Sequence, residues 1–126
     1  MMRVLVADDE KIIADTLVLI LKSAGYVAAA AYTGETALAT AATFQPQLLI
    51  TDVVMEPMNG IDAALQIKTM FPECEVMLFS GQPTAAALLE EAEARGHSFE
   101  IWAKPVAPDD LIARVRMIAE SGQGTL

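Results

Sequence analysis

The chain has 126 residues, a length typical of one domain, and its 54% apolar and 20% charged residues indicate a globular fold. Acidic residues outnumber basic ones by 17 to 8, and the resulting net charge of -9 argues against direct nucleic-acid binding. Cys74 is the only cysteine and no apolar run is long enough to cross a bilayer, so we expect a single cytoplasmic domain spanning residues 1–126.

Short apolar runs alternate with amphipathic segments along the chain. The predicted strands, buried on both faces, are residues 4–7, 27–31, 48–50, 76–79 and 99–103. The predicted helices are residues 11–24, a helix capped by Thr33 that ends at Phe44, residues 61–70 capped by Asn59, a helix from Pro83 to Gly96, and a last helix from Pro108. This order predicts an α/β fold with a parallel sheet between two helical layers.

The first helix is predicted to bury one apolar stripe. Its members are Ile13, Leu17, Ile20, Leu21 and Ala24. On this pattern Val18 lies on the outer face, between Asp15 and Lys22. It would then be either a single exposed apolar residue or part of a docking patch.

Polar residues with complementary chemistry follow four of the five predicted strands. Asp8 and Asp9 follow the first, Asp52 the third, Ser80 the fourth and Lys104 the fifth. Because ligands of open α/β sheets bind beyond the carboxyl ends of the strands, we expect these side chains to meet. Three carboxylates at one place repel each other unless a cation joins them, and oxygen ligands suit Mg²⁺. Asp52 is then a candidate nucleophile for a phosphoryl group, with Lys104 and Ser80 as donors to that group.

Each residue taken singly has a plainer interpretation. Asp8 and Asp9 could favour the positive amino end of the following helix, Ser80 could begin a turn, and Lys104 could be a solvated lysine. The combination of all of them at strand ends, in this order, favours the functional interpretation.

These residues lie within segments that resemble the response-regulator receiver domain over residues 3 to about 120. The segments are residues 4–10, 48–52, 55–60, 79–81 and 103–105. The resemblance implies a flavodoxin-like (βα)5 three-layer sandwich with strand order 2-1-3-4-5. It implies that Asp52 accepts the phosphoryl group, that Asp8, Asp9, Asp52 and the backbone carbonyl of Val54 bind Mg²⁺, and that the Lys104–Pro105 peptide is cis.

Several positions depart from the usual receiver pattern. Glu56 stands where the family more often has proline, and Pro57 follows one place late. The aromatic switch position, three residues before the lysine, holds Ile101, and Trp102 comes next; Val106 replaces a common phenylalanine. We expect the metal site and the phosphorylation chemistry to survive these changes. Ser80 and either Ile101 or Trp102 are then the candidate switch residues.

The function implied is that of a signalling module rather than an enzyme. A histidine kinase or histidine phosphotransfer protein would phosphorylate Asp52, and a downstream protein partner or output domain would read the change. The chain could be a stand-alone receiver or a piece of a longer regulator. An aspartate-nucleophile phosphatase is disfavoured because its second aspartate follows two residues after the nucleophile, unlike the Asp8-Asp9 pair. A pseudo-receiver is disfavoured because all the acidic residues are kept.

Overall fold

The computed structural model describes residues 2–81, 90, 93–94, 96, 99–104 and 106–123. The helix predicted from Pro83 to Gly96 lies largely outside the described residues. The Lys104–Pro105 peptide, for which the resemblance implies a cis bond, also lies outside them. Among the described residues a cis peptide joins Glu56 to Pro57.

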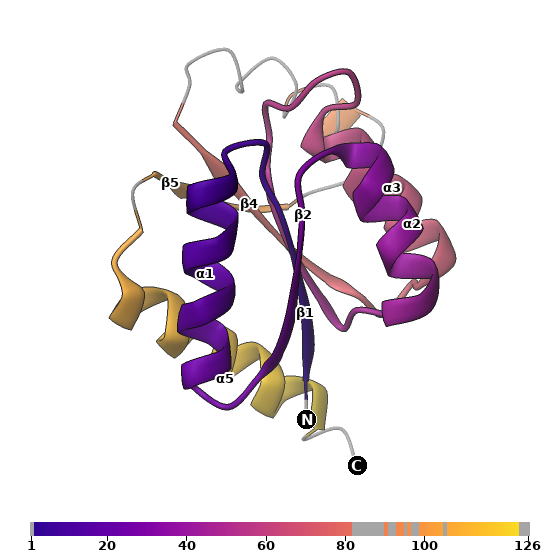
Figure 1. Ribbon diagram of the computed structural model, residues 1–126. Coiled ribbons are helices and arrows are strands. Elements are labelled where there is room, and N and C mark those ends of the chain that lie inside the picture. Colours follow the sequence, from indigo (N-terminus) through magenta and orange to yellow (C-terminus); the bar gives the residue numbers. More distant parts are fainter. Residues whose placement is uncertain are drawn as a thin grey trace.

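Five parallel strands form one sheet in the order β2-β1-β3-β4-β5 (Figure 1). Their bounds are β1 Arg3–Ala7, β2 Val27–Ala31, β3 Leu48–Asp52, β4 Glu75–Ser80 and β5 Glu100–Ala103. The strands β1, β3 and β4 are nearly continuous apolar runs, as is expected of parallel strands covered on both faces. The predicted strand order 2-1-3-4-5 of a flavodoxin-like fold is therefore confirmed.

Helices cover both faces of this sheet (Figure 1). Their bounds are α1 Lys11–Ser23, α2 Gly34–Phe44, α3 Gly60–Met70 and α5 Pro108–Gln123. One buried cluster joins the sheet to α2 and α3, and another joins it to α1 and α5. The predicted three-layer arrangement is thus confirmed for the described residues. None of the helices in this part of the chain has the length and apolar character needed to cross a membrane.

The predicted helix boundaries rest on local hydrogen bonds that the structure contains. The Thr33 side chain accepts from the backbone N–H of Thr36 at 3.0 Å, and Thr36 reciprocates, which forms a capping box at the start of α2. The Asn59 side chain accepts from the backbone N–H of Asp62 at 2.9 Å and caps α3. Gly25, just after α1, adopts a φ of +99°, a conformation that glycine reaches without strain.

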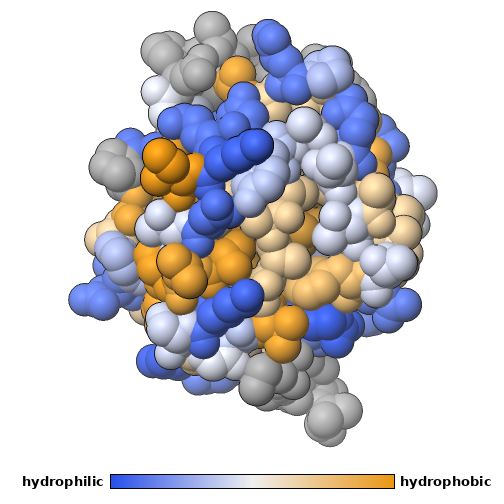
Figure 2. Space-filling view, viewed as in Figure 1, coloured by the Kyte–Doolittle hydropathy of each residue, from blue (hydrophilic) through white to orange (hydrophobic). Residues whose placement is uncertain are grey.

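The buried stripe of α1 differs from the one predicted. Val18 is only 9% exposed, so the prediction that it lies on the outer face is wrong. The buried residues of α1 are Ala14, Leu17, Val18 and Leu21, because the helix packs on α5 as well as on the sheet. The exposed apolar residues are Ile12, at 82%, and Leu19, at 67%. Figure 2 shows apolar side chains gathered over this side of the molecule.

Candidate functional site

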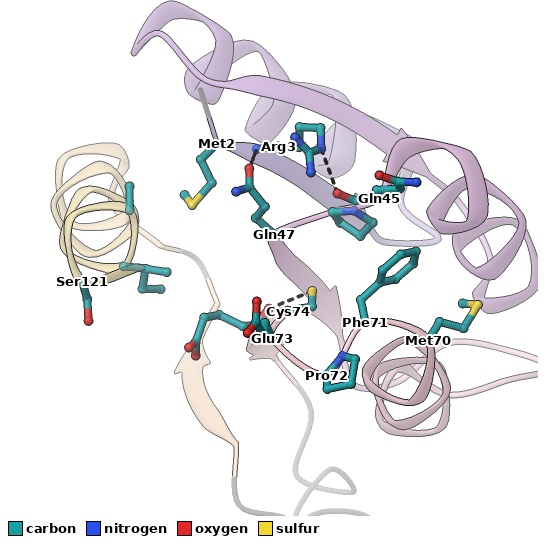
Figure 3. A pocket seen from close by; sticks show the side chains of 14 residues that line it. Met2, Arg3, Gln45, Gln47, Met70, Phe71, Pro72, Glu73, Cys74 and Ser121 are labelled. Carbon is teal, nitrogen blue, oxygen red and sulfur yellow. Dashed lines mark hydrogen bonds between the residues drawn. The ribbon is translucent and has the colours of Figure 1, made fainter. Parts of the chain in front are cut away.

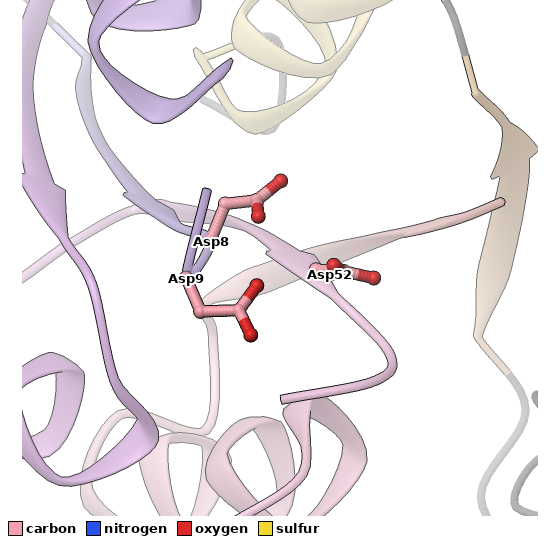
Figure 4. A group of neighbouring side chains, drawn as sticks. All are labelled: Asp8, Asp9 and Asp52. Atoms are coloured by element: carbon pink, nitrogen blue, oxygen red, sulfur yellow. The ribbon is translucent and has the colours of Figure 1, made fainter. Parts of the chain in front are cut away.

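Three carboxylates meet at the carboxyl edge of the sheet (Figure 4). Asp8 and Asp9 directly follow β1, and Asp52 is the last residue of the neighbouring strand β3. One carboxylate oxygen from each lies within 4.8 Å of the others. Asp8 and Asp52 are buried, whereas Asp9 is exposed to solvent. The predicted convergence of these three residues is therefore present in the structure.

Lys104 completes this group from the end of β5. Its ammonium nitrogen Nζ lies 2.7 Å from Asp8 Oδ2 and 3.0 Å from Asp52 Oδ2, and its side chain is only 15% exposed. Its backbone N–H donates to the carbonyl of Ser80 at 3.0 Å, which ties the ends of β4 and β5 together. The lysine thus neutralises part of the negative charge that the two buried carboxylates bring into the site.

Backbone hydrogen bonds hold the remaining carboxylate oxygens of the buried pair. Asp8 Oδ1 accepts from the N–H of Glu10 at 2.9 Å, and Asp52 Oδ1 accepts from the N–H of Val54 at 3.2 Å. Each carboxylate is therefore oriented by one backbone donor and by Lys104. Such a fixed orientation leaves few alternative rotamers for Asp52.

Burial decides the direction of the pKa shift at Asp52. Desolvation raises the pKa of this carboxyl; the hydrogen bond and charge of Lys104 oppose the rise, and the charge of Asp8 adds to it. For Lys104, desolvation alone would lower the pKa, but hydrogen bonds to Asp8 and Asp52 and their charges raise it above its ordinary value. The ammonium form of Lys104 is therefore the stable form in the folded protein.

Gly60 permits the close approach of α3 to the end of β3. A Cβ atom at Gly60 would lie 1.8 Å from the backbone oxygen of Asp52 and 2.9 Å from Thr51 Oγ1. The N–H of Gly60 donates to the carbonyl of Val53 at 2.8 Å. This contact is not predicted from the sequence, and the glycine directly after the cap Asn59 is the signal that could have indicated it.

The candidate switch residues lie on opposite faces of β5. Ile101 pairs with Leu78, whose side chain belongs to the α2–α3 core, and it is 39% exposed. Trp102 pairs with Phe79 and joins the α1–α5 core instead. Because paired residues of parallel strands share a face, Ile101 lies on the side away from Trp102. Ser80 ends β4 and is half-buried.

The donor set fits a hard divalent cation. Three carboxylates within 4.8 Å of one another carry more negative charge than Lys104 alone can balance. Oxygen donors of this kind suit Mg²⁺, which keeps several waters of its own. Asp8, Asp9 and Asp52 are therefore the residues that could hold the ion.

Replacing Lys104 with methionine is expected to destabilise the protein in the absence of Mg²⁺. Removing one partner of a buried ion pair costs about 3–5 kcal/mol, and the partial exposure of Lys104 puts the expected loss near 3 kcal/mol. Urea denaturation measures this loss, and Mg²⁺ is expected to restore part of it. The exposed Lys22→Met is the control, with an expected change below about 0.5 kcal/mol. Equal losses in the two variants would contradict the role of Lys104.

A cavity of about 870 Å³ lies at the opposite, amino-terminal edge of the sheet (Figure 3). Its lining includes Met2, Gln47, Phe71 and Cys74. Gln47 is already paired with the backbone N–H of Arg3 at 3.0 Å. Burial raises the pKa of the Cys74 thiol to about 11, which disfavours the reactive thiolate. The cavity and the carboxylate site lie at opposite edges of the sheet, and the two share no residue.

Comparison with known proteins agrees with this fold and site. The model of the response regulator receiver domain family matches residues 4–116, and the chain belongs to this family. Receiver domains are phosphoacceptor signalling modules rather than conventional enzymes, and a receiver implies a kinase partner. The chain is 29% identical over 119 residues to the chemotaxis protein CheY of Thermotoga maritima, covering 94% of this chain and 98% of CheY.

Longer proteins and a metal-bound structure are also similar to the chain. The DNA-binding transcriptional regulator NtrC of Azospirillum brasilense is 33% identical over 118 residues, which cover 94% of this chain and 24% of NtrC. Against two further relatives the chain spans about half of their length, 50% and 49%. The response regulator TrrA of Thermotoga maritima in complex with Mg²⁺-BeF superimposes with a TM-score of 0.78 and 27% identity, covering 94% and 99% of the two chains.

Proposed function

We propose that the chain, as one receiver domain spanning residues 1–126, accepts a phosphoryl group on Asp52. The observation that supports this most strongly is the position of Asp52. It is buried at the carboxyl edge of the sheet, within 4.8 Å of Asp8 and Asp9 carboxylate oxygens and 3.0 Å from the Lys104 ammonium. The Asp52 carboxylate thus has an ammonium group on one side and two further carboxylates, which could bind a metal, on the other. Such an arrangement equips a carboxylate nucleophile for phosphoryl transfer.

In the proposed reaction a carboxylate oxygen of Asp52 forms a bond to phosphorus while the bond from phosphorus to a histidine nitrogen breaks. The electron pair of the broken bond leaves with the imidazole of the donor. Mg²⁺ held by Asp8, Asp9, Asp52 and the carbonyl of Val54 would neutralise charge on the phosphoryl oxygens. Lys104 would move its hydrogen bond from the Asp52 carboxylate to one of those oxygens, and the Ser80 hydroxyl would donate to another.

The switch is proposed to use Ser80 and Ile101. We choose Ile101 because it stands three residues before Lys104, where the family carries its switch aromatic, and it lies on the face of β5 opposite Trp102. An aliphatic side chain has no polar tip to leave exposed, and its inward and outward states differ less in solvation. We therefore expect a weaker rotameric response at Ile101 than an aromatic ring would give.

The partners proposed are a histidine kinase or histidine phosphotransfer protein upstream and a protein partner or output domain downstream. Direct binding of nucleic acid by this domain is disfavoured by its net charge of -9. A cytoplasmic location is proposed, where reducing conditions suit the single thiol of Cys74.

Incubation with acetyl phosphate tests the proposed function directly. Intact-mass analysis is expected to show one phosphoryl adduct per chain when Mg²⁺ is present and almost none when the metal is removed by EDTA. The adduct should be stable in acid and labile in base, as an acyl phosphate is. Phosphorylation at the same rate in EDTA would contradict the proposed metal-dependent site.

Asp9→Ala is expected to weaken Mg²⁺ binding at least about tenfold, or about 1.4 kcal/mol. Asp9 supplies the only solvent-exposed carboxylate of the cluster and can be removed without leaving a buried charge unpaired. Titration calorimetry with Mg²⁺ measures the affinity. Glu10→Ala is the matched control, because Glu10 is the next residue, carries the same charge and lies outside the cluster. Equal affinities for Asp9→Ala and wild type would remove Asp9 from the site.

A further inference from the structure

The Glu100 carboxylate, at the start of β5, accepts hydrogen bonds from two side chains on different elements. The indole Nε1 of Trp102 donates to Glu100 Oε2 at 2.5 Å. Arg114 of α5 donates from Nε to Oε2 at 2.8 Å and from Nη2 to Oε1 at 2.5 Å. The Arg114 bonds hold the pKa of Glu100 below its ordinary value; burial opposes this effect and the Trp102 bond supports it. This two-point guanidinium–carboxylate pair fixes β5 to α5 with a defined geometry.

Trp102 connects this pair to the strand that ends at Asp52. Its ring stacks on Phe79 with centroids 6.4 Å apart and an angle of 27° between the planes. Phe79 is 3% exposed and is the strand partner of Asp52, and its carbonyl accepts from the N–H of Val53 at 2.9 Å. A continuous series of contacts therefore runs from the end of β3 through the two rings to Glu100.

The strand β5 links the Glu100 contacts to the carboxylate site. In the described part of the chain β5 pairs only with β4, and its four residues alternate between half-buried and exposed. Lys104 follows directly after β5, and its backbone N–H is bonded to Ser80, the residue after Phe79. The two residues proposed to contact phosphoryl therefore lie directly next to Phe79 and close to Trp102 along their strands, and they are joined to each other by a backbone hydrogen bond.

We propose that Glu100 is a positioning residue that couples the state of Asp52 to α5. When Ser80 and Lys104 are drawn toward a phosphoryl group, the ends of β4 and β5 shift, and the indole moves with its strand. Glu100 passes this shift to Arg114 because one carboxylate holds both donors. The inference rests on the proposed function, since it requires a phosphoryl group on Asp52. A ligand at Asp52 can change α5 only through contacts that differ between the two states, and this carboxylate provides them.

The coupling is tested by comparing wild type with Glu100→Gln by nuclear magnetic resonance and by hydrogen exchange. Beryllofluoride with Mg²⁺ takes the place of the phosphoryl group in both proteins. Trp102 is the only tryptophan, so its indole N–H resonance is unambiguous. In wild type, beryllofluoride is expected to shift this resonance and to change amide exchange in α5. In Glu100→Gln the affinity for beryllofluoride should stay within about twofold of wild type, while the change in α5 falls at least about threefold. Glu120→Gln, an exposed glutamate on α5, is the control and should behave like wild type.

A second variant separates the coupling from simple loss of packing. Trp102→Phe keeps an aromatic ring against Phe79 but lacks the N–H donor, and it should lose the α5 response in the same way. If Glu100→Gln fails to fold, Arg114→Lys makes the same comparison, because lysine keeps the charge and loses the two-point geometry. An α5 response of full size in these variants, or a wild type that binds beryllofluoride with no change in α5, would overturn the coupling. A wild type that does not bind beryllofluoride would instead overturn the proposed function on which the coupling depends.

Discussion

Asp52→Asn is expected to abolish phosphorylation by acetyl phosphate and, without Mg²⁺, to stabilise the folded protein at pH 7. Phosphorylation is lost because an amide is not a nucleophile toward phosphorus, and Asp52 is the proposed acceptor, bonded to Lys104 and to the N–H of Val54. Stability rises because the substitution removes a carboxylate whose charge is disfavoured by burial. The loss of activity and the gain in stability thus have the same cause.

The difference in unfolding free energy between Asp52→Asn and wild type should depend on pH, and the pKa shift of Asp52 gives its sign. Burial raises the pKa of Asp52 in the folded state above its unfolded value of about 3.9. Between the two values the folded state binds more protons, so the free energy of unfolding falls as the pH rises through that window. Asparagine cannot ionise, and the advantage of Asp52→Asn should be present at pH 7 and disappear as the pH falls below the unfolded pKa. Urea denaturation in EDTA over this pH range measures it.

Mg²⁺ should reverse the order of stability. At about 100 times its dissociation constant the ion would stabilise wild type by about 2.7 kcal/mol, and the variant by less, because one carboxylate ligand is gone. The exposed Asp110→Asn serves as the control and should respond to Mg²⁺ as wild type does. A variant less stable than wild type in EDTA at pH 7, or one still phosphorylated at the wild-type rate, would contradict this account.

Gly60→Ala is expected to lower stability by about 3 kcal/mol, which corresponds to roughly 10 °C in Tm. The new Cβ would lie 1.8 Å from the carbonyl oxygen of Asp52, and since this neighbour is backbone, no side-chain rotation relieves the overlap. The loop between β3 and α3 must shift, and it carries Asp52 and Val54 with it. We therefore expect Mg²⁺ affinity to fall together with Tm.

Two other glycines provide graded controls for this substitution. A Cβ at Gly81 would meet the Lys104 side chain at an ordinary 3.6 Å, and Gly81→Ala should change Tm little. A Cβ at Gly34 would lie 2.8 Å from Met58 Cβ in the loop before α3, so this loop segment must shift and Gly34→Ala should have an intermediate effect. Thermal unfolding followed by circular dichroism ranks the three variants. A Gly60→Ala protein as stable as Gly81→Ala would show that α3 does not need this close approach.

The convergence of Asp8, Asp9, Asp52 and Lys104 could be predicted because it follows from topology alone. In a parallel sheet every strand ends at the same edge, and a residue that follows a buried run must lie there. The parallel sheet could be predicted from the alternation of strands and helices, which hydrophobic periodicity reveals. The strand order 2-1-3-4-5 came from the family resemblance, because this alternation does not fix which strands are neighbours.

Features that depend on packing between distant segments could not be predicted in this way. Val18 was assigned to the wrong face because nothing in α1 itself shows that α5 packs beside it. The Glu100–Arg114 pair joins two elements whose relative angle and side-chain rotamers the sequence pattern does not specify. The short distance from Gly60 to the backbone of Asp52 is likewise a property of the loop conformation.

Asp52 is the one residue proposed to accept the phosphoryl group, and locating the adduct in the wild-type protein tests this proposal. After incubation with acetyl phosphate and Mg²⁺, borohydride reduction converts a phosphorylated aspartate to homoserine, which peptide mass spectrometry assigns to one position. The account predicts this conversion at Asp52 and background levels at Asp8 and Asp9, with none after treatment in EDTA. Conversion at Asp8 or Asp9 in place of Asp52 would contradict it.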